Sequence, residues 1–198
     1  MAEQAEAAEH GEVPSGDGER FAGYGVMGLP FASGHVLAMR RFAASSVGPG
    51  YTSVWHRDPG GRWVFWQDQL PELGCPRYFS QALAEARVAT VELEWTGPDA
   101  LRIAVPEAGL AWSSTLRATP VTQALNTVGA VLPDRAWRSP KVVAAMGPMA
   151  GAALRAGRVG LVGRAPNGQR FVANPLRVWL MPEVTATLAG TDLGPPGP

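Results

Sequence analysis

The stretch Tyr51 to Asp68, YTSVWHRDPGGRWVFWQD, constrains the fold most, because it holds two alternating aromatic and polar runs joined by a turn sequence. Pro59 presets the first turn residue and Gly61 can adopt a positive φ, so we predict a β-hairpin with a three-residue loop and a bulge. If Asp58 faces Arg62, the cross-strand pairs are Arg57/Trp63, Trp55/Phe65, His56/Val64 and Val54/Trp66. Both faces then carry large apolar side chains. Such a hairpin is buried on both sides or lines a cavity on one, which favours a ligand-holding β-barrel.

Strand patterns continue on both sides of this hairpin. Polar and apolar residues alternate strictly over Val88 to Trp95, which places Glu92 and Glu94 on one strand face. The other predicted strands cover residues 35–43, 77–79, 101–105, 109–117, 158–164, 169–173 and 176–181. An antiparallel sheet of about ten strands tends to close or to fold into two layers. We therefore predict a mainly β fold built as an antiparallel β-barrel.

From Thr119 onwards, apolar residues recur every three to four positions, as in a helix, in place of the two-residue alternation of strands. Thr119-Pro120 has the pattern of an N-cap followed by proline at the first helical position, which predicts a helix to about Val131. Ser139-Pro140 repeats this start signal, and we expect the second helix to run towards Arg155, with Gly157 as its C-cap. The two helices form an insertion at about 119–157 in a single barrel domain, 22–189. Because they are rich in Ala and Gly, self-association as a homodimer is an alternative to packing within their own domain.

The two ends of the chain differ in composition from the rest. Residues 1–19 contain six acidic residues and no Lys or Arg, so we predict a disordered acidic leader over 1–21. Residues 190–198 are predicted to form an irregular Gly/Pro-rich tail. The start lacks the pattern of a secretory signal, and no apolar run has the length of a membrane span. A cytoplasmic location without a membrane span is therefore the expectation.

Several chemistries find no support in the sequence. Gly23 to Gly28 matches G-x-G-x-x-G, but polar residues precede it and Leu29-Pro30 follows, where a dinucleotide site requires a buried strand and then a helix. We interpret it as an irregular glycine-rich entry into the barrel. The three histidines lack metal-ligand spacing, and the single Cys75 excludes a thiolate cluster. Scattered Arg residues do not form a nucleic-acid surface. We expect no metal, no cofactor and no nucleic-acid partner.

Three residues are candidates for catalysis. His56 could act as a general acid or base near neutral pH, with Asp58 or Arg77 orienting a substrate. Structural alternatives exist for each residue: Asp58 accepts hydrogen bonds within its turn, Arg77 pairs within the fold, and His56 packs in the core. Glu92 and Glu94 are an acid/base pair only if they line a barrel, and the more apolar opposite face favours an outward position beside Arg102.

Aromatic residues dominate the predicted strands and are the candidates for ligand binding. A subset that lines a pocket would suit a flat or polyene-like apolar molecule. The candidates that contact such a ligand are Trp55, Trp63, Trp66, Tyr78 and Trp112.

The Trp-bearing strand with its D-P-x-G-R-W turn, the Glu94-Trp95 strand and the Gly163 to Phe171 hairpin resemble the lipocalin-like (calycin) superfamily, in particular its carotenoid 1,2-hydratase-type branch. The resemblance covers mainly the β segments. It implies a lipocalin-like barrel that binds an apolar terpenoid or polyketide-like molecule, which some members hydrate or cyclise. The inserted helices from Thr119 to Gly157 depart from this pattern, so no catalytic residue is transferred.

The sequence therefore favours a cytoplasmic β-barrel that binds a hydrophobic small molecule such as a terpenoid, polyene or polyketide. One alternative is an enzyme of secondary metabolism of the hydratase, cyclase or isomerase type, acting on such a ligand. Another is a structural or interaction protein that associates through the Ala/Gly-rich helices.

Overall fold

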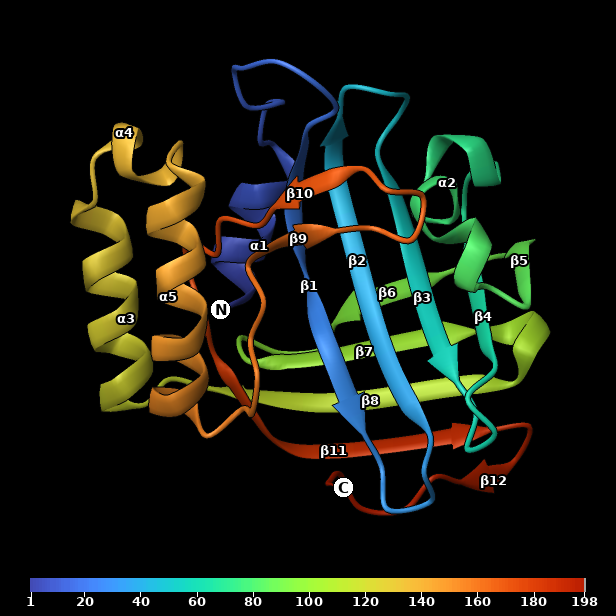
Figure 1. Ribbon diagram of the computed structural model, residues 1–198. Coiled ribbons are helices and arrows are strands. Elements are labelled where there is room, and N and C mark those ends of the chain that lie inside the picture. Colours follow the sequence, from blue (N-terminus) through green and yellow to red (C-terminus); the bar gives the residue numbers. More distant parts are fainter. Residues whose placement is uncertain (198) are drawn as a thin grey trace. The chain divides into compact units, whose positions relative to one another are not determined.

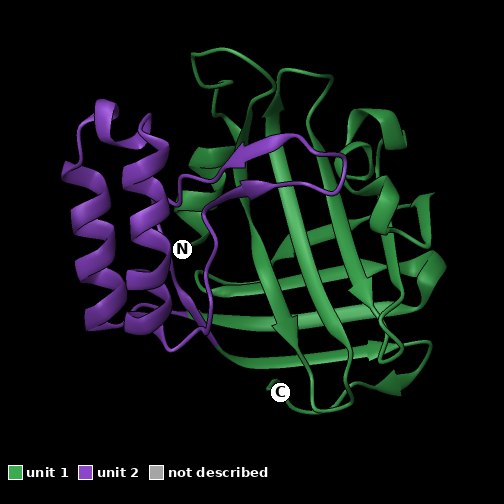
Figure 2. Ribbon diagram, in the orientation of Figure 1, with its two compact units in different colours: residues 1–116, 182–198 green, residues 117–181 purple. Residues whose placement is uncertain are grey.

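The computed structural model describes residues 1–197, so Pro198 of the predicted tail lies outside the described residues. The chain forms two compact units (Figure 2). Met1–Leu116 and Pro182–Pro198 form what we call the sandwich unit, and Arg117–Met181 form the helical unit. The helical unit contains the two predicted helices and continues beyond them through a small hairpin. The fold is mainly β, as predicted.

Two five-stranded sheets form the sandwich unit. The first has the order β1-β2-β3-β4-β5, with β1 Phe21–Pro30, β2 Val36–Ser45, β3 Tyr51–Arg57, β4 Trp63–Gln67 and β5 Glu85–Val88. The second has the order β12-β11-β8-β7-β6, with β6 Glu92–Trp95, β7 Ala100–Val105, β8 Leu110–Arg117, β11 Leu180–Leu188 and β12 Thr191–Asp192. The short 3₁₀ helix η3 Pro106–Ala108 links β7 to β8. Figure 1 shows the strands of one sheet crossing those of the other, as in orthogonal sheet packing.

The predicted hairpin is confirmed as β3 and β4, with the four predicted pairs in register. Gly61 has a φ of 87°, and its amide donates to the Asp58 carbonyl at 2.9 Å, which closes the loop. Side chains on one face of the hairpin point towards the second sheet. Tyr24 of β1 contacts Trp95 of β6, so Tyr24 lies on this inner face. Tyr24 pairs with Arg41, which is on the same face of β2 as Met39, and Met39 pairs with Val54 of the hairpin. The hairpin is therefore covered on its inner side by the second sheet.

The inner faces of both sheets supply the main core. The buried residues of the first sheet on this face include Leu37, Met39, Val54 and Trp66. The second sheet contributes Leu101, Ile103 and Val105, which alternate along the predicted strand at 101–105, together with Leu110 and Trp112. These side chains fill the space between the layers.

A separate aromatic cluster lies on the outer face of the first sheet. Tyr51, Phe65 and Cys75 are buried there, with partly buried Phe21, Phe42, Trp55, Trp63, Phe79 and Leu83 packed around them. Residues 71–84, which we call the cover, lie over this cluster and include η1 Pro71–Leu73, α2 Pro76–Phe79 and η2 Ser80–Ala82. The predicted strand at 77–79 is wrong, because Pro76 at the first helical position begins a helical turn.

The predicted closed barrel is not confirmed, because the strands divide into two separate sheets with their own edge strands. The predicted strand over Val88 to Trp95 ends at Val88 and begins again at Glu92. Its first part, β5, pairs in parallel with β4, and its second part, β6, pairs antiparallel with β7 in the other sheet. Polar and apolar residues do alternate over this stretch, but between Val88 and Glu92 the chain passes from the first sheet to the second.

The N-terminal segment is ordered at its start, which differs from the predicted disordered leader. Helix α1, Ala2–Glu9, contacts β1 and β2. Glu9 accepts hydrogen bonds from Arg41, with Nη2 to Oε2 at 2.6 Å and Nε to Oε2 at 2.9 Å. Neither composition nor period predicts this ion pair, because the two residues lie 32 positions apart. The irregular tail also contains one short strand, β12.

The glycine motif lies in strand β1, so the predicted irregular entry is wrong, and the structure explains its glycines. A Cβ on Gly23 would overlap the Arg41 carbonyl of β2, and one on Gly25 would overlap the Met39 carbonyl. The pairing of β1 with β2 also has irregularities after Ala22 and after Val26. These glycines allow the close approach of two strands.

The helical unit confirms both predicted helix starts. Helix α3, Pro120–Val131, begins with a capping box in which Thr119 and Thr122 bind each other's backbone amides. Helix α4 Asp134–Trp137 leads to α5 Pro140–Leu154, which continues through Pro148 and ends at Arg155, before the predicted cap Gly157. Strands β9 Val162–Arg164 and β10 Arg170–Val172 form the hairpin. The core of this unit is built from Trp137, Val143 and Leu161.

We expect Gly25→Ala to lower the free energy of unfolding by about 1–3 kcal/mol, because the added methyl group forces β1 away from β2. Gly97→Ala is the matched control, since its Cβ would meet only Ala100 Cβ, at an ordinary 3.7 Å. Urea denaturation of the three proteins measures the difference. Equal unfolding midpoints for Gly25→Ala and the unmodified protein would contradict the close-approach explanation.

Candidate functional site

The aromatic ligand-binding candidates do not converge on one pocket. Trp55 and Trp63 lie in the outer cluster, where Trp55 stacks on Phe65 with ring centroids 4.3 Å apart. Trp66 and Trp112 are buried on the inner faces, 6% and 1% exposed. Tyr78 lies in the cover and donates its hydroxyl hydrogen bond to Glu19 at 2.7 Å. Two groups of candidates are therefore separated by the first sheet.

His56 lies on the inner face of the first sheet, where its ring contacts that of His35. Its Nε2 is 2.7 Å from Nδ1 of His35, and the ring planes are 17° apart with centroids at 5.0 Å. Stacked rings are separated by about 3.4 Å or more, so this shorter distance means that the imidazoles meet edge to edge through a hydrogen bond. Burial lowers the pKa of His56 to about 4, helped by His35 and opposed by Asp58. His56 is therefore neutral near neutral pH, and its contact with His35 holds the β1–β2 turn to β3.

The other two catalytic candidates serve the fold in their observed contacts. The Asp58 carboxylate accepts a hydrogen bond from the backbone amide of Arg62 at 2.8 Å and so stabilises the hairpin turn. Arg77 is exposed and forms an ion pair with Glu19 at 2.5 Å. Arg77 lies in the cover on the outer side of the first sheet, whereas His56 lies on its inner face. The three candidates do not form one catalytic group.

Glu92 and Glu94 are exposed on the outer side of the second sheet, as the sequence favoured. Glu94 pairs across the strands with Arg102, at 3.8 Å between Oε2 and Nη1. Within residues 1–197, no group of three or more His, Cys, Asp or Glu side chains is placed to hold a metal ion.

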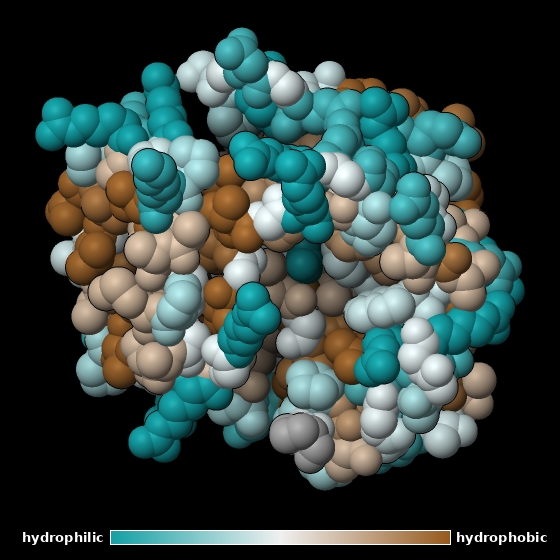
Figure 3. Space-filling model, viewed as in Figure 1, coloured by the Kyte–Doolittle hydropathy of each residue, from teal (hydrophilic) through white to brown (hydrophobic). Residues whose placement is uncertain are grey.

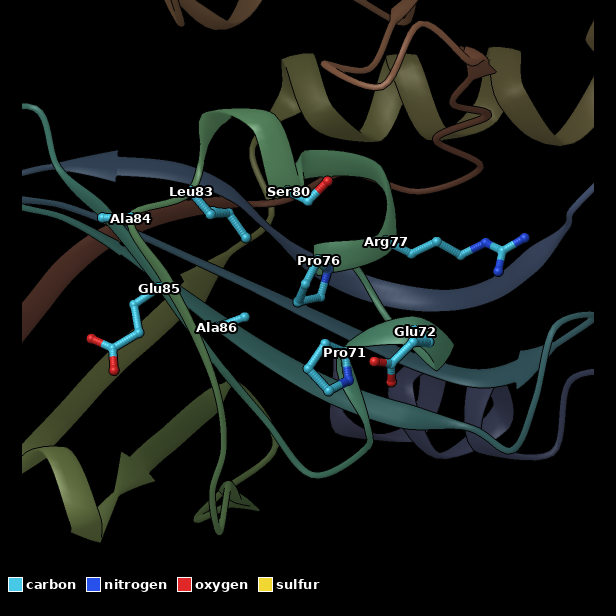
Figure 4. Close-up of a pocket in the computed structure, with 9 residues that line it drawn as sticks. All are labelled: Pro71, Glu72, Pro76, Arg77, Ser80, Leu83, Ala84, Glu85 and Ala86. Atoms are coloured by element: carbon cyan, nitrogen blue, oxygen red, sulfur yellow. The ribbon is translucent and has the colours of Figure 1, made fainter.

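An open hollow of about 430 Å³ lies at the edge of the cover (Figure 4). Its lining consists of Pro71, Glu72, Pro76, Arg77, Ser80, Leu83, Ala84, Glu85 and Ala86. Figure 4 shows the Arg77 side chain extending away from the α2 turn. None of the aromatic candidates is part of this lining, so the hollow does not coincide with the predicted ligand site.

Sequence reasoning missed the most unusual polar residue of the sandwich unit, Arg40. It lies on the outer face of β2, where alternation also places Ala38 and Phe42. Because Gly25 opposite it has no side chain, the guanidinium crosses β1 and donates through Nη1 to the Val26 carbonyl. The same nitrogen donates to the Met39 carbonyl at 2.7 Å, and the guanidinium carbon lies 4.8 Å from the Trp55 ring centre.

Arg40 lacks the carboxylate partner that its neighbour Arg41 has. Across residues 1–197, the ion pairs include Arg41 with Glu9 but none with Arg40. Burial lowers the pKa of Arg40, although a guanidinium remains charged at all ordinary pH values. Even a partly buried cation without a counter-ion is costly and therefore uncommon. The sequence signal was the dipeptide Arg40-Arg41 within a strand, which must place one charge on each face of the sheet.

Two weakly acidic groups lie beside this cation. The Tyr51 hydroxyl is 3.3 Å from the Cys75 sulfur, and both residues are buried. Burial raises the pKa of the Cys75 thiol, although Tyr51 and Arg40 act in the opposite direction. Burial also raises the pKa of Tyr51. Both groups therefore stay protonated near neutral pH, and Cys75 has the character of an inert buried thiol.

Comparisons with models of known protein families, with curated proteins and with solved structures gave no match. The resemblance to lipocalin-like proteins therefore stays a prediction.

The His35–His56 pair predicts a pH-dependent loss of stability. The unfolded chain binds a proton at His56 near pH 6.5, whereas the folded protein excludes it until about pH 4. The contribution is complete above pH 6.5 and falls as the pH decreases to about 4, by at most about 3 kcal/mol. Urea unfolding of His56→Gln across this range should show a smaller pH slope than the unmodified protein.

His10→Gln is the matched control for this titration, because His10 is exposed at the C-cap of α1 and pairs with Glu6 of that helix. It should keep the full pH slope. If His56→Gln and His10→Gln gave the same slope, His56 would not be the group that is excluded from protonation.

Proposed function

We propose that this protein binds an apolar small molecule that carries a carboxylate, and that Arg40 on the outer face of the first sheet holds this carboxylate. The observation that supports the proposal most is the partly buried guanidinium of Arg40, which has no acidic partner among residues 1–197. The ligand class agrees with the expected terpenoid, polyene or polyketide. The proposed location is the outer aromatic cluster and not a barrel interior.

The chemistry around Arg40 matches such a ligand. The guanidinium is anchored through Nη1 alone, to the two carbonyls of Val26 and Met39. Hydrogen bonds between a guanidinium and a carboxylate are among the strongest in proteins, and they offset the cost of a buried charge. Trp55, Trp63, Phe42 and Phe79 are only partly buried and supply flat apolar surface beside it. The cation would fix the acidic group while the aromatic rings contact the apolar body.

Binding is better supported than catalysis at this face. The Cys75 thiol and the Tyr51 phenol stay protonated, so neither is an activated nucleophile or base. His56, the candidate base, lies on the opposite face of the same sheet. The hydratase, cyclase or isomerase alternative therefore lacks its candidate base, His56, beside the proposed ligand.

The test uses cis-parinaric acid, a fluorescent polyene carboxylate, as the probe. We expect saturable binding with quenching of tryptophan fluorescence from Trp55. Arg40→Met should weaken binding by about 10-fold or more, because a hydrogen bond to a charged group is lost. The corresponding polyene alcohol should bind weakly and equally to both proteins.

Arg102→Met is the matched control, because Arg102 is an exposed arginine on the other sheet. It should leave the affinity unchanged. Thermal unfolding separates binding from folding, since Arg40→Met removes a desolvated charge and should be at least as stable as the unmodified protein. A folded Arg40→Met protein with unchanged affinity for the acid would refute the proposal.

A further inference from the structure

The helical unit has an extreme charge composition. It contains nine Lys and Arg residues and a single acidic residue, Asp134, for a net charge of +8. The sandwich unit has the opposite balance, and the two cancel to the formal net charge of zero.

All nine basic side chains of the helical unit are exposed. They are Arg117, Arg135, Arg138, Lys141, Arg155, Arg158, Arg164, Arg170 and Arg177. Across the described part of the chain, none of them takes part in an ion pair. Their charge is therefore available to an external anionic surface.

The two long helices of the same unit expose apolar stripes. In α3 the stripe is Val121, Ala124, Val128 and Val131, and in α5 it is Val142, Ala145, Met149 and Ala152. Val131 is 75% exposed and Met149 is 70% exposed. Both stripes follow the same helical spacing of three and four residues. Each therefore forms one continuous face.

These stripes are not the faces that fold the unit. In α3 the buried positions are Thr122 and Gly129, and in α5 they are Val143, Gly147 and Gly151. Helix α3 has no charged residue, and α5 has only Lys141, in its first turn. Figure 3 shows brown apolar side chains over the two helices, with hydrophilic side chains projecting at their ends. The unit thus presents two uncharged apolar helix faces, with exposed basic residues outside them.

We propose that the helical unit docks onto an anionic membrane surface, with the α3 and α5 stripes entering the interface and the basic residues contacting lipid phosphates. Apolar helix faces combined with surplus Lys and Arg characterise helices that lie in the membrane interface. Each basic residue near an anionic leaflet strengthens attraction to it. Among residues 1–197, no helix has both the length and the apolar character to cross a bilayer, which fits a peripheral position.

Two other occupants fit the surface less well. A second copy docked through the same face would bring two units of like charge together, and like charges oppose association. A nucleic acid would be held by donors to its phosphates, whereas the stripes offer only aliphatic groups at their centre. The membrane surface alone satisfies both the apolar stripes and the basic side chains.

The experiment measures co-sedimentation of the full chain with vesicles. We expect binding to phosphatidylcholine vesicles that contain phosphatidylglycerol, little binding to pure phosphatidylcholine, and release by salt. The double variant Val128→Glu, Met149→Glu should abolish binding, because it places a charge in each stripe. The double variant Arg135→Gln, Arg138→Gln should weaken it, by about fivefold for each charge removed.

Val88→Glu and Arg102→Gln are the matched controls, because both residues are exposed in the sandwich unit. They should bind vesicles as the unmodified protein does, and circular dichroism should show that all variants fold. Failure to bind anionic vesicles would overturn the proposal, as would full binding by Val128→Glu, Met149→Glu. A dimer in solution that this variant dissolves would instead assign the surface to a second copy. Ligand binding at Arg40 is measured without vesicles, so the two proposals fail independently.

Discussion

The need to cover both faces of the β3–β4 hairpin determines much of this structure. Its side chains alternate between two apolar sets, so neither face can remain in water without a large cost. The second sheet covers the inner set, which includes Val54 and Trp66. The residues of the cover pack on the outer set, which includes Tyr51 and Phe65. One hairpin is thus the shared wall of two hydrophobic clusters that do not mix.

Two adjacent arginines show how the same sheet treats charge on its two faces. Arg41 points to the inner side, where Glu9 of the N-terminal helix neutralises it through a bidentate contact. Arg40 points to the outer side and receives only backbone carbonyls and the face of Trp55. The fold supplies a counter-ion to one arginine and leaves the other to a partner from outside. This contrast is the reason to place ligand recognition on the outer face.

Local sequence rules succeeded where the interactions are local. Pro59 and Gly61 set the turn and therefore the register of the hairpin, and Thr119-Pro120 and Ser139-Pro140 set both helix starts. The predicted strand at 101–105 is also present, as β7, and its alternating residues Leu101, Ile103 and Val105 are buried. Alternation could not predict which strands become neighbours, because the pattern of Val88 to Trp95 continues while the chain passes from one sheet to the other. The predicted barrel depended on that continuity.

The candidate site shows the same division. The sequence identified Trp55 and Trp63 as aromatic surface, and both lie in the outer cluster. It did not identify Arg40, because two consecutive arginines in a strand do not reveal which one finds a carboxylate elsewhere in the chain. The partner of Arg41 is brought close only by packing of the helix at the start of the chain. His56 and Arg77, chosen for their chemistry, are held by contacts with His35 and Glu19.

Because of the position of the lone cysteine, opening of the cover can be measured through the reactivity of the Cys75 thiol. Cys75 is 4% exposed and its sulfur lies against Tyr51, within a cover built only of short helical turns. A thiol reagent reaches it only in molecules where this segment has opened, so the modification rate reports the opening equilibrium. No engineered probe is required, because no other thiol competes for the reagent. The modification rate of Cys75 therefore measures how often the cover opens and exposes the outer aromatic cluster.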